Sequence, residues 1–252
     1  MRRVAAVVLL TLTLLGVTVP MASAAPAPPA QAPQRVEMTM DGIGTVSAPI
    51  QVVVLMTLLT FIPAILMTMT SFTRIVIVFH FLRQALGTQE VPSNQILVGL
   101  ALFLTMFIMA PVGNTINEVA IQPVLAGKIS TIDAVDRATP PLRTFMLKQT
   151  REVDLATFIE LSKTAKPEKA ADLPMRVVIP AYVMSEVKTG FQMGFFVFVP
   201  FLLIDLVVST SLLSMGMMQL PPAMISLPFK LVLFVTVDGW SLVIKSLVRS
   251  FV

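Results

Sequence analysis

Six ionisable residues stand within stretches of sequence that are otherwise almost free of charge. They are Arg74, Arg83, Asp205, Lys230, Asp238 and Lys245. A charged side chain at the centre of a membrane helix costs about 2.5 to 3.5 kcal/mol, so such residues usually have a function. We favour ion pairs between subunits. Two alternatives stay open: a proton relay, or an arrangement in which Lys230 and Lys245 reach lipid headgroups while Asp205 caps a helix end.

Other charged residues are less distinctive. Asp238 and Lys245 are seven residues apart, which predicts one helix face without a direct bond, so each suits a partner on a neighbouring subunit. Glu186 and Lys188 precede an apolar stretch and could pair across an interface, although two charges at a helix start are often only solvated. The single histidine, His80, is interpreted as a packed or interfacial residue rather than a proton carrier.

Three methionines gather at one bend, residues 214–222. Met215, Met217 and Met218 flank Gly216, which we expect to loosen the chain, and two prolines close the segment. The methionine side chain is unbranched and polarizable, so several copies around a pore could close it and still yield to varied cargo. The alternative is flexible filling of a loop.

The composition excludes most site chemistry. There is no Cys and only one His, which rules out disulfides, Cys nucleophiles, iron–sulfur ligation and His-based metal clusters. No phosphate-binding loop or catalytic triad is recognisable, so we expect no enzyme and no cofactor. The chain is 56% hydrophobic and 13% charged, with a mean hydropathy of +0.86, which favours a membrane protein.

Residues 1–24 have the pattern of a cleaved signal peptide. A basic start, an apolar stretch and small residues at Ala22 and Ala24 predict that the mature chain begins at Ala25. An uncleaved anchor is the alternative. Without Arg2 and Arg3 the 18 basic residues become 16 against 14 acidic ones, a balance that argues against nucleic-acid binding. Residues 25–48 form a Pro/Ala-rich leader that we interpret as a flexible linker.

Four apolar tracts predict an all-α membrane protein built from two helical hairpins. The tracts are residues 50–69 with a continuation to 82, then 94–109, 191–213 and 224–247. We assign residues 49–112 to the first hairpin and 180–252 to the second. Pro63 is expected to kink the first tract, and residues 111–113 are expected to end the second. The basic turn of the first hairpin predicts a cytoplasmic location for it.

Residues 113–179 between the hairpins are rich in charge and predict a small periplasmic subdomain of three short helices. Ser130 and Asp133 have the spacing of a capping box. Pro140 is placed at a helix start and Asp154 at a helix cap, and an apolar stripe on each helix indicates a core. Residues 163–172 are expected to be a charged loop without regular structure.

Several long motifs in one order resemble the FliP/SctR family of type III export-gate proteins. They occupy residues 70–79, 84–88, 92–105, 141–143 with 149–152, 180–183, 200–207, and 227–231 with 237–240. The resemblance covers the chain from about residue 50 to its end, and the signal peptide suits the flagellar branch. It implies a non-enzymatic subunit of the export channel. Five copies would form a helical ring with FliQ and FliR, above FlhA and FlhB, through which unfolded flagellar proteins leave the cell.

The resemblance also implies bent hairpins that lie in a ring largely outside the bilayer plane, with Arg74, Lys230 and Asp238 at subunit interfaces. It places Met217 and Met218 at the gate. Gln219 stands where many relatives have a third methionine, and it could hydrogen-bond around the ring. The same role in a virulence injectisome is one alternative. A proton or small-molecule transporter that uses Asp205 and Asp238 is another, although the two hairpins share little internal repetition.

Overall fold

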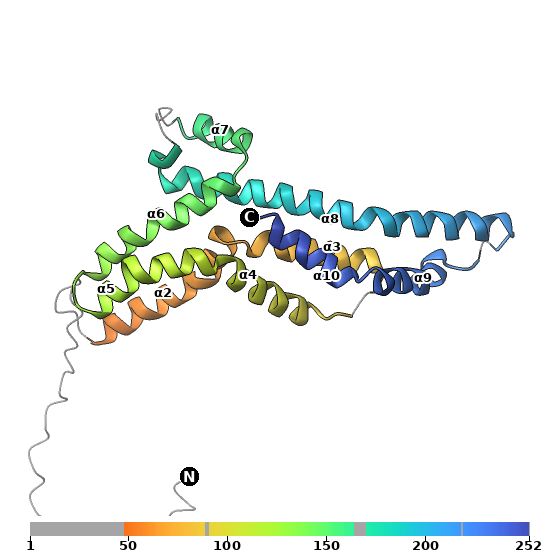
Figure 1. Cartoon of the computed structure of the whole chain (residues 1–252), viewed down its shortest axis with the longest axis horizontal. Helices are drawn as coiled ribbons and strands as arrows, with labels where there is room; N and C mark the ends of the chain where they lie inside the picture. Colours follow the sequence, from red (N-terminus) through yellow and green to blue (C-terminus); the bar gives the residue numbers. More distant parts are fainter. Residues whose placement is uncertain (1–47, 89–90, 164–169, 218, 252) are drawn as a thin grey trace, which may run out of the picture. The chain divides into compact units, whose positions relative to one another are not determined.

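The structure, a computed structural model, describes residues 48–88, 91–163, 170–217 and 219–251 of one compact unit that runs from residue 38 to residue 252. The described residues form helices and contain no strand, which confirms the expected all-α class (Figure 1). The predicted signal peptide with Ala22, Ala24 and Ala25, and nearly all of the leader, lie outside the described residues. Met218 also lies outside them.

The first apolar tract is two helices rather than one. They are helix α2 (Ala48–Met69) and helix α3 (Phe72–Leu86), and the last part of α2, Leu59–Met69, meets α3 at an angle of 71°. Pro63 lies inside α2, but the sharp break falls at residues 70–71. A helix end leaves main-chain carbonyl groups without partners, and such groups are costly away from water.

Side-chain hydroxyl groups satisfy the carbonyl groups at this break. Thr70 Oγ1 donates to the Leu66 carbonyl, and Thr73 Oγ1 donates to the Met67 carbonyl. The Tyr182 hydroxyl donates to the carbonyl of Thr70 at 2.8 Å, from a helix far along the sequence. These three main-chain carbonyl groups at the bend therefore each accept a hydrogen bond from a side-chain hydroxyl group, although the surrounding residues are apolar.

The second tract extends well beyond its predicted end. Helix α4 (Asn94–Ile116) continues through a π-helical turn, η1 (Asn117–Ile121), into α5 (Gln122–Leu125). Pro111 lies inside α4 and does not end it, which corrects the prediction. One proline removes a single main-chain hydrogen bond, a loss that apolar helices tolerate. The wider turn of η1 precedes Pro123, another residue without an N–H donor.

The charged segment holds two main helices. The predicted capping box is confirmed, because Ser130 and Asp133 bond reciprocally at the start of α6 (Thr131–Gln149). Pro140 lies inside α6 rather than at a helix start, and α7 (Glu152–Leu161) has Arg151 rather than Asp154 at its N-cap. The expected loop contains a short 3-10 turn, η2 (Ala170–Asp172). Residues 164–169 of this expected loop lie outside the described residues.

The last two tracts form the second hairpin. Helix α8 (Met175–Ser214) is continuous through Pro180 and Pro200 and begins far before the predicted apolar tract. The final tract is again broken: α9 (Pro222–Thr236) and α10 (Gly239–Arg249) meet at 63°. By length and composition, α4 with α5 and α8 suit membrane spanning, and each bent pair could add one further span.

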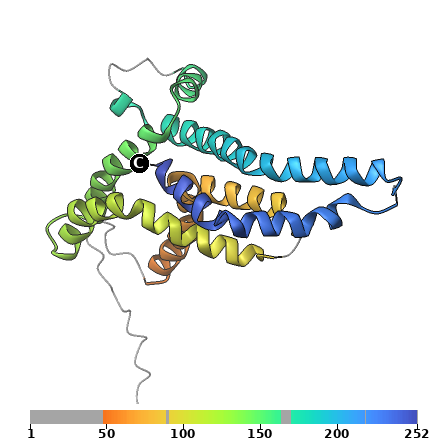
Figure 2. The same cartoon turned by 45° about the vertical axis from the view of Figure 1, so that its right-hand side comes forward.

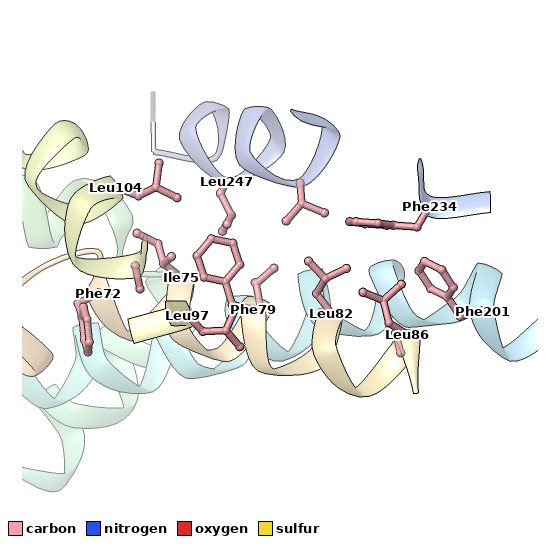
Figure 3. Close-up of a cluster of buried hydrophobic side chains, with 14 residues drawn as sticks. Phe72, Ile75, Phe79, Leu82, Leu86, Leu97, Leu104, Phe201, Phe234 and Leu247 are labelled. Atoms are coloured by element: carbon pink, nitrogen blue, oxygen red, sulfur yellow. The ribbon is translucent and has the colours of Figure 1, made fainter. Parts of the chain in front are cut away.

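Helix α3 lies at the centre of the unit, beside α4, α8 and α10 (Figures 1 and 2). Its buried face carries Ile75, Phe79 and Leu82. Leu247 of α10 lies over Phe79, and Leu97 and Leu104 of α4 belong to the same core (Figure 3). Helices α3 and α8 approach closely where α8 carries Gly190 and Gly194. A Cβ atom at Gly194 would lie 2.5 Å from the Phe81 ring, so only glycine permits this approach.

Candidate functional site: buried charges and the methionine loop

Arg74 and Glu186 form a buried ion pair between α3 and α8. The guanidinium donates to both carboxylate oxygens, with Nε to Oε2 at 2.9 Å. The side chains are 2% and 0% exposed, so water does not screen the pair. Glu186 lies about three turns after the first residue of α8, Met175, and so is not at a helix start. The structure therefore neutralises Arg74 within the chain.

The remaining N–H donors of Arg74 bond to groups near the end of the chain. Nη1 donates to the carbonyl and hydroxyl oxygens of Ser250 at 3.0 and 2.9 Å, and Nη2 donates to Gln149 Oε1 at 3.3 Å. Together with the two bonds to Glu186 these make five, the number of N–H groups in a guanidinium. The guanidinium carbon lies 3.8 Å from the centroid of the Phe251 ring, a cation–π geometry.

A second ion pair joins α7 to α8. Lys188 donates to Asp154 Oδ1, and Asp154 is 3% exposed while Lys188 is 49% exposed. Arg151, at the N-cap of α7, donates to Gln192 and Thr189 of α8. These contacts attach the short helix to α8 near the boundary between its polar and apolar parts.

A third ion pair joins α8 to α9. Lys230 donates to Asp205 Oδ2 at 2.7 Å, and Ser226 donates to Asp205 Oδ1 at 2.6 Å. The lysine side chain is 6% exposed and the aspartate 33%. A Cβ atom on Gly87, at the end of α3, would lie 3.9 Å from Lys230 Nζ. Lys230 thus lies buried where three helices meet, and Asp205 lies inside α8 rather than at a helix cap.

Three other predicted charges have no ion-pair partner among the described residues. Arg83 is half-buried and donates to His80 Nδ1 at 3.3 Å, and His80 is exposed. Asp238 lies in the break before α10 with φ +50°, and Lys245 lies on α10, so the single helix that we predicted for both does not exist. Both side chains are exposed, and the structure does not bring them together.

The methionine loop follows an ordered helix end. Gly216 has φ +72°, its N–H bonds to the Leu213 carbonyl, and the Met217 N–H bonds to the Leu212 carbonyl. These two bonds define a Schellman motif, so Gly216 terminates α8 and fixes the backbone of Met217 instead of loosening it. Met215 is 71% exposed and Met217 40%, and Gln219 is also exposed. The loop lies at the far end of the α8–α9 hairpin (Figure 1).

Within the described ranges, no group of three or more His, Asp or Glu side chains could hold a metal ion. The arrangement is instead a helical scaffold with three internal ion pairs and an exposed, thioether-bearing loop. The FliP family matches residues 55–247. The chain belongs to this family.

Curated members of the FliP family are similar over most of their length. The flagellar biosynthetic protein FliP of Bacillus subtilis is 53% identical over 206 residues, which cover 82% of this chain and 93% of that protein. The corresponding protein of Pectobacterium carotovorum is 55% identical over 80% of this chain and 78% of its own length. That of Caulobacter vibrioides is 50% identical over 83% and 79%.

Sequence reasoning missed several residues of this scaffold. Gln149, Ser250 and Phe251 complete the surroundings of Arg74, and Ser226 completes those of Asp205. No local pattern distinguishes these polar residues from solvated ones. The only signal was indirect, since an arginine within an apolar stretch requires more acceptors than one carboxylate offers.

Proposed function

We propose that this chain is a pore-forming subunit of the flagellar type III export gate, which conducts unfolded flagellar proteins across the bacterial inner membrane. Membership in the FliP family supports the flagellar role, since the similar proteins are flagellar biosynthetic proteins. The function is transport rather than catalysis.

The observation that carries the gating role is the exposed methionine loop at the end of an apolar hairpin. Met215 and Met217 have no apolar core to fill, because both side chains are exposed in the single chain. Large exposed apolar groups are typical of surfaces that another chain covers. In a ring, the loops of several copies would meet, and their thioether side chains would form a compliant seal that includes Met218 and Gln219.

The ring would contain several copies of this chain, five by family resemblance, together with FliQ and FliR, and would act with FlhA and FlhB. Asp238, Lys245 and Arg83 are available for ion pairs with neighbouring subunits, because the described chain does not pair them. The exposed apolar faces of α4, α8 and α9 would be covered by these subunits or by lipid. The signal peptide would direct export of the leader, and the charged segment around α6 and α7 would lie on the periplasmic side.

Substitution of the loop methionines tests the proposal. The triple variant Met215→Ala, Met217→Ala and Met218→Ala, in the complete complex, is expected to raise the passage of small ions through the closed channel. Met224→Ala is a matched control, because Met224 is 72% exposed but lies within α9 beyond the loop. An unchanged ion conductance in an intact complex would contradict the gate.

A further inference from the structure

Helix α10 is held to the rest of the unit by one face only. Val243 and Leu247 are buried against the core around α3, whereas Leu242, Lys245 and Arg249 are exposed. Its main chain comes close to another helix chiefly at the junction with α9. Elements with few buried contacts open locally at a lower free energy than the core does.

The end of this helix is fastened by polar and aromatic contacts. Ser250 supplies two of the five acceptors of Arg74, and Gln149 Nε2 donates to the Phe251 carbonyl at 3.0 Å. The Phe251 ring is stacked on Phe145 of α6, with centroids 6.3 Å apart. Each of these contacts is made to α3 or α6, so the residues that follow α10 are attached to both of these helices.

The beginning of α10 is a strained joint. Asp238 has φ +50° and ψ +54°, a conformation that a residue with a side chain adopts at some cost, and its side chain makes no capping bond. Gly239 follows directly, and a Cβ atom there would lie 2.2 Å from the Phe234 ring. The joint is therefore held bent by packing against α9.

We propose that residues 239–251 form a releasable strap, hinged at Asp238 and fastened at Arg74. The strap would open as a unit while α3 and α8 stay folded. Its hinge end continues into α9, which carries Lys230 and follows the methionine loop, so opening would free α9 to shift against α8. This coupling to the loop rests on the proposed gating function, whereas the opening of the strap does not.

Amide hydrogen exchange of the full-length protein in detergent tests the opening. Gln149→Ala removes the bond to the Phe251 carbonyl and one acceptor of Arg74, and is expected to speed exchange of the α10 amides about tenfold relative to those of α3. Phe251→Ala is a second variant with the same expected direction. Phe158→Ala is the control, because this half-buried ring lies on α7, away from the strap.

A parallel rise of exchange in α10, α3 and α8 would overturn the strap, because it would mean global destabilisation. So would unchanged exchange in both variants. Ion leakage through the complete complex then tests the coupling: Gln149→Ala is expected to raise it, and faster α10 exchange without leakage would refute a link to the loop. Failure of the methionine variants to leak would count against the gate and leave the exchange result unaffected.

Discussion

Arg74 and Glu186, 112 residues apart in the sequence, share two hydrogen bonds inside the unit, and neither side chain reaches solvent. An ion pair of this kind gives little net stability, because both charges lose their hydration. Removing one partner is a different matter, since the other then remains charged and buried.

Glu186→Ala is expected to lower the free energy of unfolding by about 3 to 5 kcal/mol, because Arg74 keeps its charge and loses two acceptors. The double variant Arg74→Met with Glu186→Leu is expected to recover most of this loss. Denaturant unfolding in detergent measures both. A double variant as unstable as Glu186→Ala would show that the remaining acceptors, Gln149 and Ser250, impose the larger penalty.

Gly194 permits the close approach of α8 to α3. Gly194→Ala is expected to destabilise the protein by roughly 1 to 3 kcal/mol, because the new Cβ atom meets the Phe81 ring. Gly99→Ala on α4 is the matched control, since nothing lies within 4 Å of its Cβ position, and it is expected to be neutral or stabilising. Thermal unfolding compares the two. If Phe81→Leu fails to rescue Gly194→Ala, the clash is not the cause.

The Asp205–Lys230 pair is asymmetric, with the lysine far more buried than the aspartate. Asp205→Ala therefore leaves a buried ammonium group, and about 2 to 3 kcal/mol of stability is expected to be lost. Lys230→Met leaves a carboxylate that water can reach and is expected to cost less. Unfolding free energies of the two variants decide the order, and equal losses would contradict the asymmetry.

Tyr182 donates a hydrogen bond to the carbonyl of Thr70 at the break between α2 and α3. Tyr182→Phe is expected to cost about 1 to 2 kcal/mol, because it leaves this carbonyl without the donor in an apolar setting. Thr73→Val removes the donor to the Met67 carbonyl and is expected to act in the same direction. Thr57→Val, an exposed threonine within α2, is the control. Equal effects at all three positions would argue against a special role for the break.

The apolar tracts were predictable because the mean hydropathy of a segment depends only on residues that are adjacent in the sequence. The capping box at Ser130 was predictable for the same reason, since its two side chains are three residues apart. The breaks were not. At one break, a carbonyl group bonds to Tyr182, more than a hundred residues away, and the other break includes a positive φ at Asp238 beside the close packing of Gly239 against Phe234.

The candidate site was predictable as a set of residues but not as a set of contacts. Buried charges are conspicuous in an apolar sequence, so Arg74, Asp205 and Lys230 could be identified. Their partners could not, because tertiary packing chooses among several carboxylates of equal chemical type. Gly216 shows a related limit: a glycine before a loop is compatible with either flexibility or an ordered helix end, and only the hydrogen bonds of Leu212 and Leu213 distinguish the two.

The 40 residues of α8 have a consequence for how the chain relates to a bilayer. At 1.5 Å per residue the helix is about 60 Å long, whereas the hydrocarbon layer of a membrane is about 30 Å thick. No tilt within the usual range places all of it among acyl chains. If α8 crosses a bilayer, part of it must extend beyond the hydrocarbon layer, and the half that carries the charged residues Glu186 and Lys188 suits that part. Because α8 is one continuous helix, a displacement at that end would then reach the methionine loop.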